Sequence, residues 1–330
     1  MAFSLFSPRN RIVNLVINDH SIRFVELKQV KPPTAQRWSE RLLPPGIIAD
    51  GKIVDGESLA NILEECIEEW KIQRRQVRFI IPDSLVIIRK VSIPSEIQDD
   101  EIHGYLYLEL GSSIHLPFEE PVFDIFPLSN NGKTKEILLF AAPEKYVMEF
   151  SDILSDLKLN PVAADISPLT IYRLYYQLGK AKENETLFTA QFDLTSVNMC
   201  IFEGSTPYVM RSFPLNFEIH KWETKQSNGN ISYKYIGEAN DLAMELEDIF
   251  HEINKLNDFY RYSLYNGKKQ VTNFLVSGDH PMLHLIFEEM KERYELPVEK
   301  LEIGNETNGK AEKIPPKYYL PLGLALKEVR

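Results

Sequence analysis

The amino-acid sequence predicts an α/β protein made of two lobes of the same design. Its 330 residues are enough for about two domains, and 44% of them are hydrophobic, so each domain can bury a core. The second half of the chain also repeats the order that opens the first half, in which three short strands precede alternating helices and strands. Such a repeat is typical of a duplicated fold with a cleft between its halves.

The first half, residues 1–180, opens with a predicted hairpin. Strands at 12–17 and 21–30 flank a turn at Asn18-Asp19-His20, and a third strand follows at 35–42. Apolar residues spaced three and four apart then predict a helix at 58–70. The other predicted elements of this half are strands at 77–81, 86–93, 122–128, 136–142 and 162–166, and helices at 95–112, 144–159 and 168–179.

The second half, residues 181–330, starts after a polar and charged boundary at 180–185. Its first two predicted strands flank the turn Asp193-Leu194-Thr195-Ser196, and the polar segment 221–234 predicts a loop. The predicted elements are strands at 187–192, 197–202, 207–214, 271–276 and 297–301, and helices at 238–265, 281–294 and 318–327.

Composition argues against several classes of function. A net charge of −11 disfavours binding to nucleic acid or to anionic membrane surfaces. Cys66 and Cys200 lie in apolar segments and provide no disulfide framework or cysteine zinc site. His280 and His284 have helical spacing but lack a nearby third metal ligand. No apolar run approaches the roughly 18 residues of a spanning helix, so we expect a soluble intracellular protein without direct membrane insertion.

A series of short segments, in a fixed order over nearly the whole chain, resembles the type IV pilus assembly protein PilM family. This family is related to the cell-division protein FtsA within the actin-like superfamily. The segments are 22–27 (IRFVEL), 43–55 (LPPGIIADGKIVD), 80–84 (IIPDS), 91–94 (VSIP), 114–120 (IHLPFEE), 161–165 (PVAAD), 252–260 (EINKLNDFY), 274–278 (FLVSG) and 322–326 (LGLAL).

The resemblance implies two actin-like, ribonuclease H-like lobes. Residues 1–180 would form the first lobe, with an inserted β-α-β-β-α subdomain at about 84–160, and residues 181–330 would form the second. Proteins of the family are cytoplasmic and lie at the inner face of the cell membrane through their partners. They dock the N-terminal tail of a bitopic membrane protein, PilN, in a groove between the core and the insert.

The resemblance also implies a nucleotide cleft, but with degenerate motifs. Actin-like folds bind ATP and magnesium with two hairpins that each offer an acidic residue and a glycine. Here Val16 stands where the first acid is expected and Asn18 where the first glycine is expected. The second hairpin keeps the acid, Asp193, but has Thr195 in place of glycine. The family also has a pair of glycines later in the chain, where this sequence has Ser277 followed by Gly278, so only one glycine is present. Glu252 matches a family position on the helix beside the nucleotide.

Asn18, Asp193, Thr195, Glu252 and Gly278 are therefore the candidate cofactor-binding residues. They form either a weak site for ATP or ADP with magnesium, or a vestigial cleft. We expect a non-catalytic scaffold of a type IV pilus or of a related competence or secretion machine, which binds PilN-like and other assembly proteins. The alternative is an actin-like ATPase whose nucleotide state switches partner binding. A third possibility, a sugar kinase of the same superfamily, is disfavoured because it would need the acid and glycine hairpins that this chain lacks.

The residues of the partner groove cannot be assigned from the sequence. Tyr105, Tyr107, Leu108 and Leu110 form an aromatic and apolar cluster in the predicted insert. They line the groove or form the core of the insert.

Overall fold

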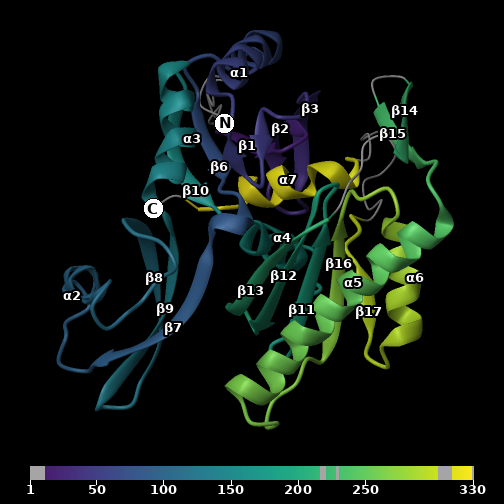
Figure 1. The fold of residues 1–330 in the computed structure, drawn as a ribbon. Helices are drawn as coiled ribbons and strands as arrows, with labels where there is room; N and C mark the ends of the chain where they lie inside the picture. The colour runs from purple at the N-terminus through teal and green to yellow at the C-terminus, as the bar shows by residue number, and fades with distance from the viewer. Residues whose placement is uncertain (1–11, 216–220, 228–229, 304–313, 329–330) are drawn as a thin grey trace, which may run out of the picture.

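The computed structural model describes residues 12–215, 221–227, 230–303 and 314–328 and has two five-stranded sheets (Figure 1). The strand orders are β10-β6-β1-β2-β3 and β17-β16-β11-β12-β13. In each sheet, an antiparallel meander of three strands is extended by two parallel strands beside its first strand. The predicted duplication of an α/β lobe is therefore confirmed.

In the first lobe, apolar residues of the sheet pack against helices on one face. Val13, Leu15 and Ile17 alternate along β1 toward this core, where they meet Leu63 of α1 and Phe150 of α3. The strands are β1 (Val13–Asn18), β2 (Ser21–Gln29), β3 (Thr34–Leu42), β6 (Gln76–Ile80), β10 (Asn160–Asp165) and the short pair β4 (Ile48–Ala49) and β5 (Lys52–Ile53). The helices are α1 (Gly56–Trp70), η2 (Asp83–Leu85), α3 (Glu144–Asp156) and α4 (Ser167–Gln177).

A smaller three-stranded sheet, in the order β7-β9-β8, projects from this lobe. Ile102 and Leu106 of its helix pack on one face of the sheet against Ile137 and Leu139. Helix α3, the last helix of the predicted insert, instead packs into the core of the first lobe. The predicted insert limits of about 84–160 stay a prediction. The elements are β7 (Ile87–Pro94), α2 (Ile102–Glu109), β8 (Pro121–Asn130) and β9 (Thr134–Pro143).

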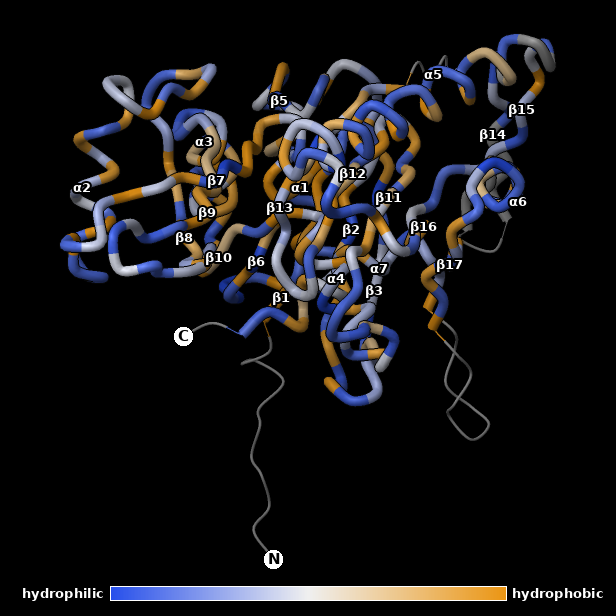
Figure 2. Tube along the Cα trace, turned by 90° about the horizontal axis from the view of Figure 1, so that it is seen from below, coloured by the Kyte–Doolittle hydropathy of each residue, from blue (hydrophilic) through white to orange (hydrophobic). Residues whose placement is uncertain are grey.

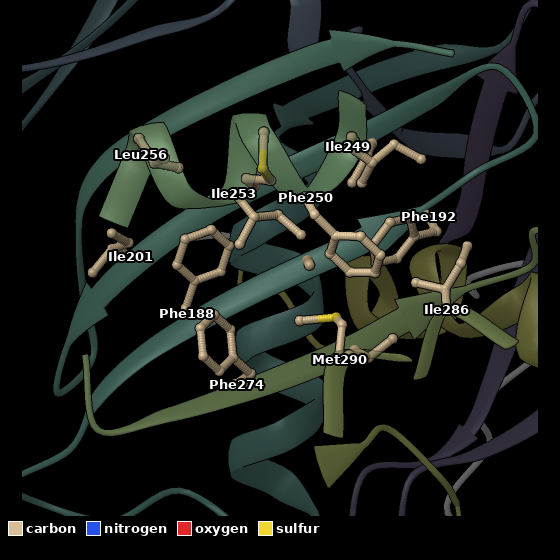
Figure 3. Packing of buried hydrophobic residues seen from close by; sticks show 14 of the residues in the cluster. Phe188, Phe192, Ile201, Ile249, Phe250, Ile253, Leu256, Phe274, Ile286 and Met290 are labelled. Carbon is tan, nitrogen blue, oxygen red and sulfur yellow. The ribbon is translucent and has the colours of Figure 1, made fainter. Parts of the chain in front are cut away.

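The second lobe buries a large aromatic and aliphatic core between its sheet and two helices. Figure 3 shows Phe188 and Phe274 of the sheet against Ile253 of α5 and Met290 of α6. The strands are β11 (Thr186–Phe192), β12 (Ser196–Glu203), β13 (Thr206–Pro214), β16 (Asn273–Gly278) and β17 (Val298–Lys300). The helices are α5 (Ala239–Asp258), which continues as a π-helical turn at Phe259–Leu264, and α6 (Leu283–Arg293).

The predicted loop at 221–234 is wrong, because the chain there forms a two-stranded ribbon. Strands β14 (Trp222–Ser227) and β15 (Asn230–Tyr235) pair antiparallel, with Trp222 opposite Tyr235. The rings of these two residues lie 5.0 Å apart. Polar composition suggested a loop, whereas aromatic residues favour a cross-strand pair even in a polar segment.

Two helices lie between the two sheets and join the lobes (Figure 1). Helix α4 and the C-terminal helix α7 (Tyr319–Ala325), which follows η5 (Pro316–Tyr318), share one apolar cluster with residues of both sheets. We call it the shared core; it includes Val16 of β1, Leu174 of α4 and Leu275 of β16. A Cβ on Gly323 would lie 2.2 Å from the carbonyl oxygen of Thr170, so glycine allows the helices to approach closely.

Hydropathy follows this arrangement: Figure 2 shows hydrophobic segments along the central strands and hydrophilic ones in outer helices and loops. Within the described ranges, no helix has the length and apolar character that crossing a membrane requires.

Candidate functional site

A cleft of about 250 Å³ lies between the two lobes. The β1–β2 turn contributes Asn18 to its lining, and the β11–β12 turn contributes Asp193 and Thr195. The lining also includes residues of the β4–β5 turn, the end of β6, η2, the start of α4, β12 and β13. The structure thus brings together three of the five candidate cofactor-binding residues.

The other two, Gly278 and Glu252, do not line this cleft. Gly278 ends β16 with φ +116°, and a Cβ there would lie 2.0 Å from the carbonyl oxygen of Phe192. Its missing side chain thus allows two backbones to approach closely. Glu252 lies on α5, and its carboxylate is 2.6 Å from the ammonium of Lys255.

The lining of the cleft is acidic: it includes Asp19, Asp50, Asp83 and Asp193 but no lysine or arginine among the described residues. Both carboxylate oxygens of Asp193 accept hydrogen bonds from the side-chain nitrogen Nε2 of Gln191, at 3.0 and 2.9 Å. Burial raises the pKa of Asp193, and the nearby charge of Asp279 raises it further.

Asp83 and Asp19 are held by backbone N–H groups. Asp83 accepts a hydrogen bond of 3.1 Å from the backbone N–H of Ser167, and burial raises its pKa to about 7. Asp19 accepts from the backbone N–H groups of Asp50 and Gly51, and burial raises its pKa as well. A cleft lined by four aspartates disfavours a further negative charge such as that of a phosphate.

A buried ion network lies beside the cleft, since His20 of the lining is 3.3 Å from the guanidinium of Arg23. The guanidinium of Arg23, on β2, lies 2.6 Å from Glu40 of β3 and 2.5 Å from Asp279, which follows β16. The ammonium of Lys317, in η5, lies 2.6 Å from the other oxygen of Glu40. These four residues, which we call the interlobe ion network, link the meander of the first lobe to two segments of the second.

The cleft residues do not fit a magnesium nucleotide. The side chain of Val16 points into the shared core, where an acid would be needed to order the metal. Arg23, the nearby cation, is already bound by Glu40 and Asp279. Across the described ranges, no group of three or more His, Cys, Asp or Glu side chains is placed to hold a metal ion. The nucleotide roles of the five candidate residues stay predictions.

A second concave site, which we call the insert groove, lies between the insert and the core and has a volume of about 370 Å³. Its lining is mainly apolar. It includes Val122 and Phe126 of β8, Phe140 of β9, Leu169 of α4 and Pro207 of β13. Because β8 is the outer strand of the order β7-β9-β8, one edge of its backbone has no strand partner in the sheet.

The sequence cluster on the insert divides between core and surface and does not line this groove. Tyr105 and Leu110 pack against the core of the insert, whereas Tyr107 and Leu108 are exposed. The groove residues could have been detected in β8 itself. Val122 and Phe126 alternate with Phe123 and Ile125, which pack toward α2, so the strand is apolar on both faces.

Comparison with solved structures agrees with this architecture. A structure described as the PilM-PilN type IV pilus biogenesis complex has 19% sequence identity and a TM-score of 0.71, covering 97% of this chain and 98% of that chain. MreB5 of Spiroplasma citri bound to ADP has 10% identity and a TM-score of 0.51, covering 95% and 94%. The ethanolamine utilization protein EutJ of Carboxydothermus hydrogenoformans has 11% identity and a TM-score of 0.50, covering 97% and 90%.

These likenesses confirm the predicted actin-like fold. A search of curated proteins finds no significant match. The family described as type IV pilus assembly protein PilM matches residues 15–329. Because that match spans nearly the whole chain, the protein belongs to the type IV pilus assembly protein PilM family.

Proposed function

We propose that this protein is a non-catalytic, cytoplasmic scaffold of a type IV pilus assembly machine. It binds the cytoplasmic tail of a PilN-like membrane protein in the insert groove and is thereby held at the inner face of the membrane. Family membership supports the role in pilus assembly, and the similar structure described as a PilM-PilN complex supports the choice of partner. The observation that carries the proposal is an apolar groove beside an open strand edge.

The geometry of β8 favours an extended peptide. A peptide that adds to a strand edge forms main-chain hydrogen bonds, and its alternate side chains enter pockets. Pro121 and Pro127, which have no N–H to donate, bracket the segment Val122–Phe126. Val122 and Phe126 are exposed apolar residues at the two ends of this segment, so both can contact apolar side chains of the peptide.

The charges at the groove favour a tail with some basic character. Asp124 is exposed on β8 and lies in the lining. Asp165 also lines the groove but is bound by Arg173 and, at 3.6 Å, by Lys327. Asp124 thus provides a carboxylate that a lysine or arginine of the tail can reach.

The proposal predicts that a peptide of about 15 residues, taken from the N-terminus of the PilN-like protein of the same organism, binds this protein. Phe126→Asp should weaken binding at least tenfold, because it places a charge in an apolar pocket. The matched control is Met244→Ser, which changes an exposed apolar residue of α5 outside the groove. Fluorescence anisotropy with a labelled peptide measures both affinities.

Two further peptides test strand addition. One peptide has methyl groups on the backbone nitrogens of its odd-numbered residues, and the other has them on the backbone nitrogens of its even-numbered residues. Since only one set of N–H groups faces the partner strand, one peptide should lose binding and the other should keep it. Equal loss with both, or no effect of Phe126→Asp, would show that the tail does not bind β8 in this way.

We also expect the interlobe cleft to bind nucleotide poorly. Isothermal titration with ATP or ADP, each at millimolar concentration with magnesium, should give no binding heat, and neither should raise the melting temperature. A dissociation constant of about 100 μM would stabilise the protein by about 1.4 kcal/mol at 1 mM ligand. Stabilisation of that size would favour the nucleotide-dependent switch over the scaffold.

A further inference from the structure

Helix α2 of the insert presents a second apolar surface, outside the insert groove. Tyr107 and Leu108 are 73% and 79% exposed, whereas Ile102 and Leu106 on the other side of the helix are buried in the insert core. A helix that is apolar on both sides is normally covered on both sides. The outer side of α2 has no such cover within the described residues, which leaves a pair of large apolar side chains in water.

The chain segment that carries this pair has charge of one sign, and of its acidic residues Asp124 lines the insert groove instead. Between Val91 and Gly132 the sequence contains eight acidic residues and no lysine or arginine. All are exposed except Glu109, which is partly buried. The acidic residues are Glu96, Asp99, Asp100, Glu101, Glu109, Glu119, Glu120 and Asp124. One is neutralised from outside the segment, since Lys135 of β9 lies 2.7 Å from Asp99.

We propose that the outer face of α2 docks a basic amphipathic helix of a partner protein. The apolar pair supplies the contact area, and the acidic residues select lysines and arginines that flank the apolar positions of the partner. The main-chain groups of α2 are bonded within the helix, so the contact is made by side chains, with ridges of one helix in grooves of the other. Gly104 lies one turn before Leu108, and a Cβ there would meet nothing within 4 Å. It leaves room for a partner side chain.

The same charges argue against the other occupants of an exposed apolar face. A membrane surface carries negative charge, so the acidic segment is repelled from it. A second copy of this chain, docked α2 against α2, would bring two acidic segments together. The tail in the insert groove occupies a different surface, because neither Tyr107 nor Leu108 lines that groove.

The probe is an 18-residue peptide with leucines at helical spacing on one face and lysines elsewhere. Its control has the same composition in scrambled order, so the total charge is equal and the apolar face is lost. We expect the wild type to bind the amphipathic peptide at least tenfold more tightly than the scrambled one. Leu108→Ser and Gly104→Arg should each remove this difference. Gly104→Arg adds bulk and positive charge where the fold has open space.

The matched controls are Met244→Ser and Tyr176→Ser, which remove exposed apolar side chains, 70% and 60% accessible, from other parts of the molecule. Both should bind the two peptides as the wild type does. The proposal is overturned if the wild type does not discriminate between the peptides, or if Leu108→Ser and Gly104→Arg leave the discrimination intact. It is also overturned if Leu108→Ser abolishes a dimer in sedimentation or binding to vesicles that contain anionic lipid.

Discussion

Replacing Arg23 by methionine is expected to lower the free energy of unfolding by about 3 to 5 kcal/mol, the usual cost of removing one partner of a buried ion pair. Methionine keeps the apolar length of the side chain but leaves Glu40 and Asp279 without their shared cation. The Arg23 side chain is only 4% exposed, so water cannot replace the lost charge. Chemical denaturation at pH 7 measures the difference.

The pH dependence of that difference tests its cause. Burial alone would raise the pKa of Glu40, but Arg23 and Lys317 hold this pKa below its ordinary value. A depressed carboxyl pKa contributes stability that is present at neutral pH and is lost as the pH falls through that pKa. Wild type and Arg23→Met should therefore converge in stability only as the pH falls below the ordinary glutamate pKa of 4.5, through the lowered pKa of Glu40.

Arg41→Met is the matched control for Arg23→Met. Arg41 also bridges two carboxylates, at 3.0 Å from Glu65 and 2.6 Å from Glu69, but on an exposed face of the first lobe. Such pairs contribute about 1 kcal/mol or less. Equal losses for both variants, or a loss for Arg23→Met that does not shrink as the pH falls from 4.5 to about 3, would contradict a buried network that holds the lobes together.

Gly278→Ala is expected to destabilise the protein by about 4 kcal/mol or to prevent folding, since strain and overpacking each cost about 1 to 3 kcal/mol. Gly278 has φ +116°, and the new Cβ would lie 2.0 Å from the carbonyl oxygen of Phe192. That carbonyl accepts hydrogen bonds from the backbone N–H groups of Asp279 and His280, at 3.0 and 3.1 Å. It cannot move away without breaking them. Thermal unfolding followed by circular dichroism measures the effect.

Gly267→Ala separates the two causes. Gly267 also has a positive φ, +79°, but a Cβ there would meet nothing within 4 Å. It should therefore cost only about 1 kcal/mol, from backbone strain alone. If both variants lose the same stability, the contact with Phe192 has no role at Gly278.

Periodicity and turn residues predicted the order of the elements because both lobes follow local rules. The meanders, the parallel strands and the helices all show apolar spacing that neighbouring residues determine. The ribbon at β14 and β15 was missed for the same reason, since its residues are mostly polar and its strands pair only with each other. Ile231, Tyr233 and Tyr235 alternate with polar residues, so a strand signal was present but was outweighed by the polar composition.

The cleft could be predicted only in part, because its main contacts join distant segments. Arg23 alternates with Ile22 and Phe24, so the pattern places it on the face away from the first core, which would usually be solvated. The second lobe covers that face, and Asp279 is 256 positions later in the chain. Gly278 was singled out only as a candidate cofactor-binding residue, whereas the structure shows that a side chain is excluded there. The neighbouring backbone that excludes it becomes visible only in the structure.

The position of α4 between the two sheets determines how the molecule would respond to mechanical load. Leu169 of α4 lines the insert groove, while Ile171 and Leu174 of the same helix lie in the shared core. A pull on a tail bound in the groove would therefore pass through one rigid helix into both sheets at once. Under the proposed function, the two lobes would resist that pull together and act as a single stiff anchor for the tail.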